Sequence, residues 1–428
     1  MINQDRFHSL DAVRGFALLL GIVLHATMSF FMPIPRMDNS PSTTLSVFYF
    51  VVHVFRMPVF FLIAGFFAHM VFHRKGGGTF IKDRARRIGF PLIVCFVTLI
   101  PAPVAAYIWG ATGSSWLKAC LSILKGQFHG SINWAHLWFL YYLCIFYIVS
   151  LVLYWIFDRF IDRNGRLGIL IDKLLSISVR SYGAPFLLAV PVFLCLHFSD
   201  NWFLWMGIDS PGTTIIPQLA PMIGFGTAFG FGWFLHRQTA LLAEWKNRWG
   251  LNLGIALALT IFCLYLVGLN PDFMAMFTSK NLEGWRRFGY AAAYTTAAWF
   301  WIFGILGAAL RFCSGFSARR RYLADASYWL YLMHLPVIVY LQAVMANLPL
   351  HWSFKFTAIL AVTTALGLIS YHYLVRSTFI GSILNGRRYP GMHVGAGTTA
   401  GRTSSGVIDS GLPLYKGAEN HTFTGYAH

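Results

Sequence analysis

Two ionisable side chains, Arg14 and His25, lie eleven residues apart in one apolar segment, residues 10–31. In a helix, eleven residues make about three turns, so both side chains would share a face and lie about 16 Å apart along the axis. Ionisable side chains inside a membrane cost free energy, and they often line the path of a substrate or a proton. An arginine that snorkels to the lipid headgroups and a histidine packed against a neighbouring helix would explain the spacing equally well.

Asp11 precedes Arg14 by three residues, so the two side chains can pair on one helical face. The pair would either neutralise Arg14 or aim its guanidinium at an anionic ligand. If the N-terminus is cytoplasmic, His25 lies in the outer half of the membrane. An imidazole there is a candidate general base, because histidine titrates near neutrality.

A second apolar segment, residues 44–72, carries His53 and Arg56, which would be neighbours on one face of a helix. Packing alone is a poor explanation for two ionisable groups within one such segment. His53 and Arg56 are therefore candidate site residues.

Three arginines, Arg84, Arg86 and Arg87, precede the apolar segment 88–109. Such a cluster is typical of a cytoplasmic loop in a membrane protein. It is also suited to clamp the phosphates of a nucleotide-containing donor, because the arginine fork binds phosphate in bidentate fashion. Both interpretations stay open, and the predicted donor site consists of these arginines and Asp11.

Two later segments add further histidines. His136 and Trp138 begin the apolar segment 135–157, where they would either join an aromatic belt at the membrane surface or line the entrance for a sugar. His334 lies in the middle of the segment 322–345, where an imidazole is costly without a partner. These three side chains are further candidate site residues.

The composition indicates the elements that must position these residues. The chain is 57% hydrophobic and 11% charged, whereas soluble domains are about 25% charged. Many apolar runs approach the roughly 20 residues that cross a bilayer as a helix. An all-α polytopic membrane protein follows, and the long runs exclude a transmembrane β-barrel. The six cysteines show no CxxC spacing, so we expect neither a metal site nor a disulfide framework.

We predict ten transmembrane helices. They cover residues 10–31, 44–72, 88–109, 135–157, 183–199, 216–235, 251–269, 288–310, 322–345 and 353–375. With both termini in the cytoplasm, 24 Lys and Arg residues fall on the inner side and seven on the outer side, as the positive-inside rule requires. This alternation also argues against nucleic acid as the partner of the +18 net charge.

The chain divides into two parts by composition. Residues 1–386 contain all the apolar segments and form the predicted membrane domain. Residues 387–428 are rich in Gly, Ser and Thr and lack apolar periodicity, so we predict a disordered cytoplasmic tail.

Taken in order, the motifs resemble the membrane-bound acyltransferase-3 family. The matching motifs are R-x10-H at Arg14 and His25, FFxxxGF at 60–66, the basic stretch at 84–91, HLWFL at 136–140 and YLMH at 331–334. Where the family has Ser in the FFxxSGF motif, this chain has Ala64. The segments around His53, His136 and His334 are most similar to members that succinylate periplasmic glucans.

The resemblance implies an O-acyltransferase of the bacterial inner membrane, with a cytoplasmic acyl-CoA donor, such as succinyl-CoA, and a periplasmic glucan as the acceptor. No further cofactor is expected. In this interpretation His25 is the general base and Arg14 holds charge of the donor. The predicted contacts for the acceptor or for the carboxylate of the acyl group are His53, Arg56, His136, Trp138 and His334, since a guanidinium such as that of Arg56 binds carboxylates in bidentate fashion. The acyl group would pass through the helical bundle either directly or by way of an acyl-enzyme.

A transporter or exporter of glucan, lipid or drug is the alternative function. Helical bundles of that class also contain histidines and arginines within the membrane, often as proton relays. Inverted repeats are typical of many transporters, and the two halves of this sequence show no convincing match.

Overall fold

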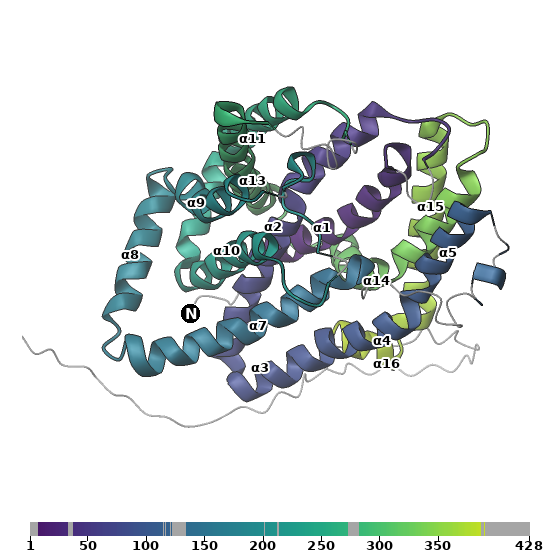
Figure 1. The fold of residues 1–428 in the computed structure, drawn as a ribbon. Helices are drawn as coiled ribbons and strands as arrows, with labels where there is room; N and C mark the ends of the chain where they lie inside the picture. The colour runs from purple at the N-terminus through teal and green to yellow at the C-terminus, as the bar shows by residue number, and fades with distance from the viewer. Residues whose placement is uncertain are drawn as a thin grey trace, which may run out of the picture. The chain divides into compact units, whose positions relative to one another are not determined.

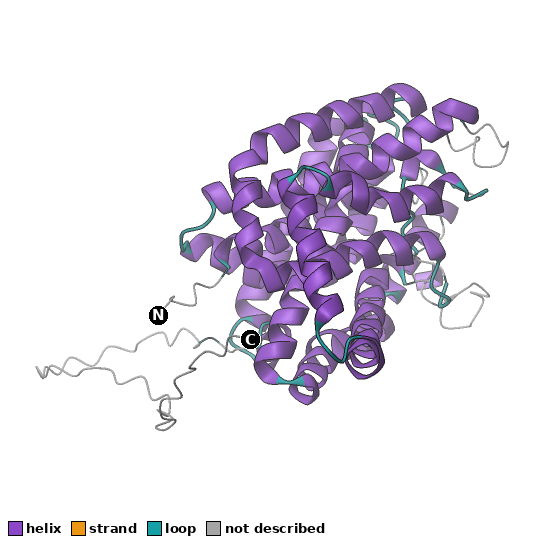
Figure 2. Ribbon diagram, turned by 90° about the vertical axis from the view of Figure 1, so that its left-hand side faces the viewer, coloured by secondary structure: helices purple, strands orange, loops and turns teal. Residues whose placement is uncertain are grey.

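The structure is a computed structural model. The residues that it describes are 7–32, 37–113, 115, 117–119, 121, 134–200, 202–211, 214–272, 282–386 and 389. Within these ranges every regular element is a helix (Figure 2), which confirms the all-α class. The predicted tail, 387–428, lies outside the described residues except for Tyr389.

The helix that carries Arg14 and His25, α1 (His8–Thr27), is central to the architecture (Figure 1). It contacts α2 (Thr43–Lys75), α13 (Gly284–Phe312), α14 (Ala318–Met345) and α15 (Trp352–Ser370). Half of its residues are buried apolar or small side chains, so it is anchored on several sides at once. The prediction that Arg14 and His25 belong to one continuous helix is confirmed.

Helix α2 packs very closely against α10 (Leu219–Leu235) because glycines face backbone at two places. A Cβ atom added at Gly65 would lie 2.0 Å from the carbonyl oxygen of Phe229, and one added at Gly232 would lie 1.9 Å from that of Leu62. No side chain fits at either position. Close approach through small residues is a common mode of helix packing in membranes, and here it fixes the position of α2 and thus of His53 and Arg56.

The remaining helices complete the bundle. They are α3 (Gly77–Arg84), η2 (Ala85–Gly89), α4 (Phe90–Leu99), α5 (Pro101–Thr112), α7 (Trp138–Ile156), η4 (Phe157–Ile161), α8 (Arg166–Arg180), α9 (Ala184–His197), α11 (Leu242–Val267), η7 (Tyr371–Val375) and α16 (Phe379–Leu384). Short helical turns join several of them, including the segment from Leu204 to Met206 and the one from His236 to Leu241.

All ten predicted membrane segments fall on helices, but the number of spans is a separate question. Eight helices in the described ranges are long and apolar enough to cross a membrane, or nine if the bent pair α8 and α9 forms one span. One of the eight is Leu219–Val267, which contains two of the predicted segments and has non-helical backbone at Gln238. The chain is a multi-pass membrane protein, and the count of ten stays a prediction.

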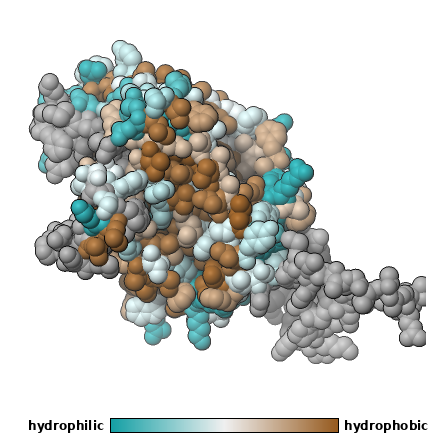
Figure 3. All heavy atoms as spheres, turned by 90° about the vertical axis from the view of Figure 1, so that its right-hand side faces the viewer, coloured by the Kyte–Doolittle hydropathy of each residue, from teal (hydrophilic) through white to brown (hydrophobic). Residues whose placement is uncertain are grey.

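The outward surface of the bundle is apolar, as lipid contact requires. Figure 3 shows a broad hydrophobic area with hydrophilic residues at its margins. Exposed apolar side chains such as Ile93, Val97, Ile148 and Leu366 lie on α4, α7 and α15. A soluble monomer rarely exposes so much apolar surface, so this pattern agrees with the membrane assignment.

Candidate functional site

A polar cavity of about 210 Å³ lies at the end of α1 that carries Arg14. We call it the arginine cavity. Its charged lining consists of four arginines and two aspartates: Arg14, Arg84, Arg87, Arg321, Asp11 and Asp325. The rest of the wall is mainly apolar and aromatic, with contributions from α2, α7 and α14. The excess of guanidinium groups suits the cavity to an anionic ligand.

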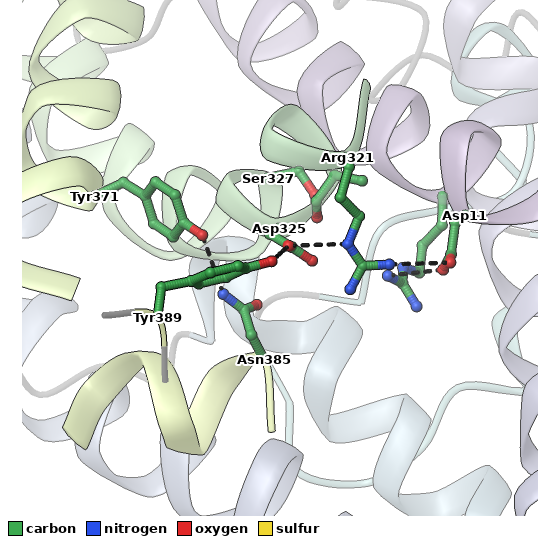
Figure 4. Close-up of polar contacts among 9 residues, drawn as sticks. Asp11, Arg321, Asp325, Ser327, Tyr371, Asn385 and Tyr389 are labelled. Carbon is green, nitrogen blue, oxygen red and sulfur yellow. Dashed lines mark hydrogen bonds and ion pairs between the residues drawn. The ribbon is translucent and has the colours of Figure 1, made fainter. Parts of the chain in front are cut away.

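The charged side chains of α1 and α14 form a ladder of ion pairs along one wall (Figure 4). Nη2 of Arg14 lies 3.1 Å from Oδ1 of Asp11, which confirms the predicted pair. Oδ2 of Asp11 lies 3.7 Å from Nη1 of Arg321, and Nε of Arg321 lies 3.0 Å from Oδ2 of Asp325. Each carboxylate therefore contacts at least one guanidinium, and the ladder connects two helices.

Of the three arginines in the predicted phosphate clamp, two line the cavity and Arg86 does not. Arg84 and Arg87 line the cavity, and Asp83 holds both, at 3.8 Å from Nε of Arg84 and 3.0 Å from Nε of Arg87. The guanidinium of Arg84 also lies 5.2 Å from the ring centroid of Tyr147. Arg86, in contrast, is exposed and donates a hydrogen bond to Ser382 at 3.4 Å. Arg84 is the last residue of α3, whereas Arg86 and Arg87 belong to the π-helical turn η2.

One face of α1 carries residues of the arginine cavity and, further along the helix, residues of a second polar region around Arg56 and His25. Asp11, Arg14 and Leu18 line the cavity. One turn further on, Gly21 lies against Arg56, because a Cβ atom there would be 2.8 Å from Nη1 of the guanidinium. The next position at this spacing is His25. The steps of three and four residues keep all these positions on one face of the helix.

Three imidazoles meet at the other end of this face, and we call His25, His136 and His334 the histidine cluster. The ring centroid of His334 lies 5.2 Å from that of His25 and 5.1 Å from that of His136. His136 and His334 are buried, whereas His25 is half-buried. The backbone carbonyl of His25 accepts a hydrogen bond from Gln342 at 2.8 Å, which fixes this turn of α1 against α14.

The hydrogen bonds of the cluster define which ring nitrogens carry hydrogen. Nδ1 of His334 contacts the carbonyl oxygen of Tyr331 at 2.6 Å, and Nε2 of His136 contacts that of Leu332 at 3.0 Å. Because a carbonyl only accepts, both contacts require an N–H donor. Nε2 of His334 and Nδ1 of His136 are buried and have no protein partner in the described part of the chain. Buried unpaired polar atoms are rare and often mark functional sites.

Arg56 lies between the two regions. Its side chain is buried, and its Nε has no hydrogen-bond partner among the described residues. Gly21 of α1 lies against its guanidinium group. A buried cation without a carboxylate close by is costly, so this position is suited to receive a negatively charged group.

His53 and Trp138 lie outside the histidine cluster, and their predicted contact with an acceptor stays a prediction. Nε2 of His53 contacts the carbonyl oxygen of Ile208 at 3.2 Å, and its ring stacks on Tyr49. His53 thus holds the segment 202–211 in place. Trp138 is buried and packs against Phe225, at 5.5 Å between ring centroids. Neither contact joins these side chains to the histidine cluster.

Sequence reasoning missed several residues of the arginine cavity, namely Arg321, Asp325, Tyr328 and Asn385. Arg321 counted only toward the positive charge of a cytoplasmic loop. The signal that could have identified it is the spacing of Arg321 and Asp325, which places opposite charges four residues apart at the start of an apolar helix. The sequence around Asn385 contains no motif that indicates its position in the cavity.

The two regions offer different chemistry. The arginine cavity can hold a ligand with several negative charges, and the histidine cluster can accept or pass a proton. In the described ranges, no group of three His, Cys, Asp or Glu side chains has a geometry that could hold a metal ion.

Comparisons with known proteins bear on the whole chain. A family model described as "Acyltransferase domain" matches residues 7–372. The chain is 24% identical over 400 residues to "Glucans biosynthesis protein C" of Escherichia coli O157:H7, covering 90% of this chain and 96% of that protein. It is 30% identical over 164 residues to the protein of the same name from Shigella dysenteriae serotype 1 (strain Sd197), covering 37% of this chain and 40% of that relative. That alignment spans less than half of the relative's length. No solved structure matches the chain.

Proposed function

We propose a specific reaction for this chain, which belongs to the acyltransferase-domain family: transfer of a succinyl or similar acyl group from an acyl-CoA to hydroxyl groups of a periplasmic glucan. The family membership supports a membrane acyltransferase. The succinyl group, the acyl-CoA donor, the glucan acceptor and the bacterial inner membrane are our proposals. The names of the relatives and the charges of the site support them.

The arginine cavity is the proposed donor site. An acyl-CoA carries several phosphate charges, and four arginines against two aspartates give the lining a net positive charge. Arg84 and Arg87 would bind phosphate oxygens, since both guanidinium groups already face the cavity. Arg14 would hold donor charge at the start of the path along α1.

The histidine cluster is the proposed place of reaction. His25 would take the proton of the acceptor hydroxyl while the hydroxyl oxygen attacks the thioester carbon. The C–S bond then breaks, and the thiolate of CoA receives the proton, so an ester and free CoA result. General base catalysis of this kind contributes about 10²–10⁴-fold to the rate.

The buried guanidinium of Arg56 gives a reason for a dicarboxylic acyl group. The free carboxylate of a succinyl chain would pair with Arg56, which has no carboxylate partner among the ion pairs of the described residues. His334 and His136 would line the acceptor side. His53 contacts the segment 202–211, and its contact with the acceptor stays a prediction.

The single observation that carries this proposal is the shared face of α1. It leads from the cavity at Arg14, past Leu18 and the Gly21–Arg56 contact, to His25. We propose that the acyl chain of a donor bound in the cavity extends along this face of the helix toward the imidazole of His25. Trapping of a labelled acyl-enzyme would distinguish a covalent relay from direct transfer.

The test is transfer by the purified full-length protein in lipid nanodiscs. Succinyl-, acetyl- and malonyl-CoA are offered in parallel with neutral glucan, and the product is measured by mass spectrometry. We expect succinylated glucan and free CoA in equal amounts. Absence of transfer from all three donors would overturn the proposal.

A deletion strain tests the exporter alternative. Neutral glucans that still reach the periplasm of this strain indicate a modifying enzyme. Glucans retained in the cytoplasm would indicate an exporter and would contradict the proposed transfer reaction.

A further inference from the structure

The last described part of the chain contributes to the arginine cavity. This C-terminal segment consists of residues 379–386 and Tyr389, and it lies beyond residues 7–372 that match the family model. Leu384 and Asn385 line the cavity directly. The family match therefore does not account for this wall of the site.

Gly386 lets the segment approach the phosphate-binding side of the cavity. Its φ of +69° lies in the left-handed region, which favours glycine. A Cβ atom at this position would lie 1.7 Å from Nη2 of Arg87. The guanidinium of Arg87 thus rests directly on the glycine backbone, and its orientation depends on the segment.

Asn385 is held beside this contact. Its Nδ2 donates a hydrogen bond to the hydroxyl of Tyr371 at 3.3 Å (Figure 4). The bond joins the segment to η7 and orients the amide. An amide at the rim of an arginine-lined cavity can donate to and accept from a polar ligand.

Tyr389 is anchored at three points. Its backbone N–H donates to the carbonyl oxygen of Arg376 at 3.3 Å, and its ring centroid lies 4.9 Å from the guanidinium carbon of Arg376. Its hydroxyl donates to Oδ2 of Asp325 at 2.6 Å. A hydrogen bond from a neutral donor to a carboxylate is stronger than one between neutral groups.

The hydroxyl of Tyr389 thereby reaches the ladder of ion pairs. Oδ2 of Asp325 also accepts from Arg321, which shares Asp11 with Arg14. Asp325 is buried, so its charge requires hydrogen bonds. Without the tyrosine hydroxyl, Asp325 would lose one hydrogen bond, and its contact with Arg321 would change. Because Arg321 and Arg14 both contact Asp11, a shift of Arg321 would change the orientation of Arg14.

We propose that the C-terminal segment is part of the donor site, with Asn385 as a contact for the donor and Tyr389 as a positioning residue that orients Arg14. The positioning acts through Asp325, Arg321 and Asp11. The inference rests on the proposed function, since it assumes that the arginine cavity binds an acyl-CoA.

The experiment measures donor binding and turnover of the full-length protein with Tyr389→Phe. Loss of one hydrogen bond to a charged group is expected to weaken donor affinity about tenfold, with a rise in the KM for donor and a smaller change in kcat. Asn385→Ala is expected to raise the same KM. Tyr373→Phe is the matched control, because it removes a hydroxyl from a tyrosine of η7 that is 71% exposed.

A double-mutant cycle separates positioning from a general structural effect. If Tyr389 acts through Arg14, Tyr389→Phe changes donor KM much less in an Arg14→Ala background than in the wild type. Additive effects of the two substitutions would overturn the positioning role.

Direct binding of acyl-CoA separates failure of this inference from failure of the proposed function. A wild-type protein that binds no acyl-CoA contradicts the donor assignment itself. A wild-type protein that binds and transfers normally, with Tyr389→Phe and Asn385→Ala indistinguishable from it, contradicts only the role of the C-terminal segment.

Discussion

The two ends of one helical face of α1 differ in how their polar groups are satisfied. In the arginine cavity, charges are paired with each other across helices, and space for a ligand remains. In the histidine cluster, the imidazole rings lie close to one another, and His136 and His334 each have a buried ring nitrogen without a partner among the described residues. The first arrangement is suited to bind a large anion, and the second is suited to interact with a small reacting group.

The contrast separates binding from chemistry. Paired guanidinium groups keep a fixed direction and still have donors left for a ligand, because each has five N–H groups. An imidazole without a partner on one nitrogen is able to accept a proton there. Substitutions at the two ends should therefore affect different kinetic constants, and this expectation can be tested.

The largest expected effect is that of His25→Ala. Removal of the general base should lower kcat about 10²–10⁴-fold, while acyl-CoA binding stays at the wild-type level. The measurement combines single-turnover kinetics with equilibrium donor binding. His8→Ala is the control, since His8 lies at the opposite end of the same helix. Glucan acylated at the normal rate by a folded His25→Ala protein would refute the role of this imidazole.

At the other end, Arg84→Ala should raise the KM for donor about tenfold or more, because a hydrogen bond between charged groups is lost. The change in kcat should be much smaller. Arg86→Ala provides a matched control, since Arg86 is exposed and does not line the cavity. Equal effects of the two substitutions on donor KM would contradict the division of the arginine cluster seen in the structure.

Gly21→Ala tests the connection between the two regions. The added methyl group would displace Nη1 of Arg56, which is the end of a flexible side chain, so we expect a fall in kcat of a few-fold and little change in thermal stability. Gly65→Ala is the comparison, because its methyl group would meet the backbone of α10 and should destabilise the fold by about 1–3 kcal/mol. An unchanged kcat in Gly21→Ala would show that catalysis does not depend on the present position of the Arg56 guanidinium.

The smallest effect is expected at Asp209, in the segment that His53 holds. Burial raises the pKa of the Asp209 carboxyl from 3.8 to about 6. The folded state then binds this proton more readily than the unfolded state, so stability falls as the pH rises from 3.8 to about 6. Asp209→Asn should flatten this part of the pH dependence, as measured by thermal unfolding in nanodiscs. Parallel profiles for the two proteins would contradict a raised pKa of the half-buried Asp209 carboxyl.

The sequence predicts much of the fold because apolar length is a local property. Each predicted membrane segment is helical in the structure, and the pair Asp11–Arg14 follows directly from helical spacing. Apolar length does not determine the number of spans, since the break at Gln238 and the bend between α8 and α9 depend on packing between helices.

The site was predictable only where its residues share a helix. Arg14 and His25 could be related by counting turns, but the contact of His25 with His334 joins α1 to α14 across more than 300 residues of sequence. Arg86 could not be separated from Arg84 and Arg87 by sequence, because residue type and spacing do not show that its side chain lies against Ser382 outside the arginine cavity.

The sequence by itself determined a multi-pass helical protein and the face of α1 on which Arg14 and His25 lie, because membrane length and helical period are read from consecutive residues. Tertiary structure decided which arginines share one cavity, which imidazoles meet, and that Asn385 and Tyr389 join the site. These outcomes depend on contacts between distant helices, and the close packing of glycines such as Gly65 sets the distances at which those contacts form.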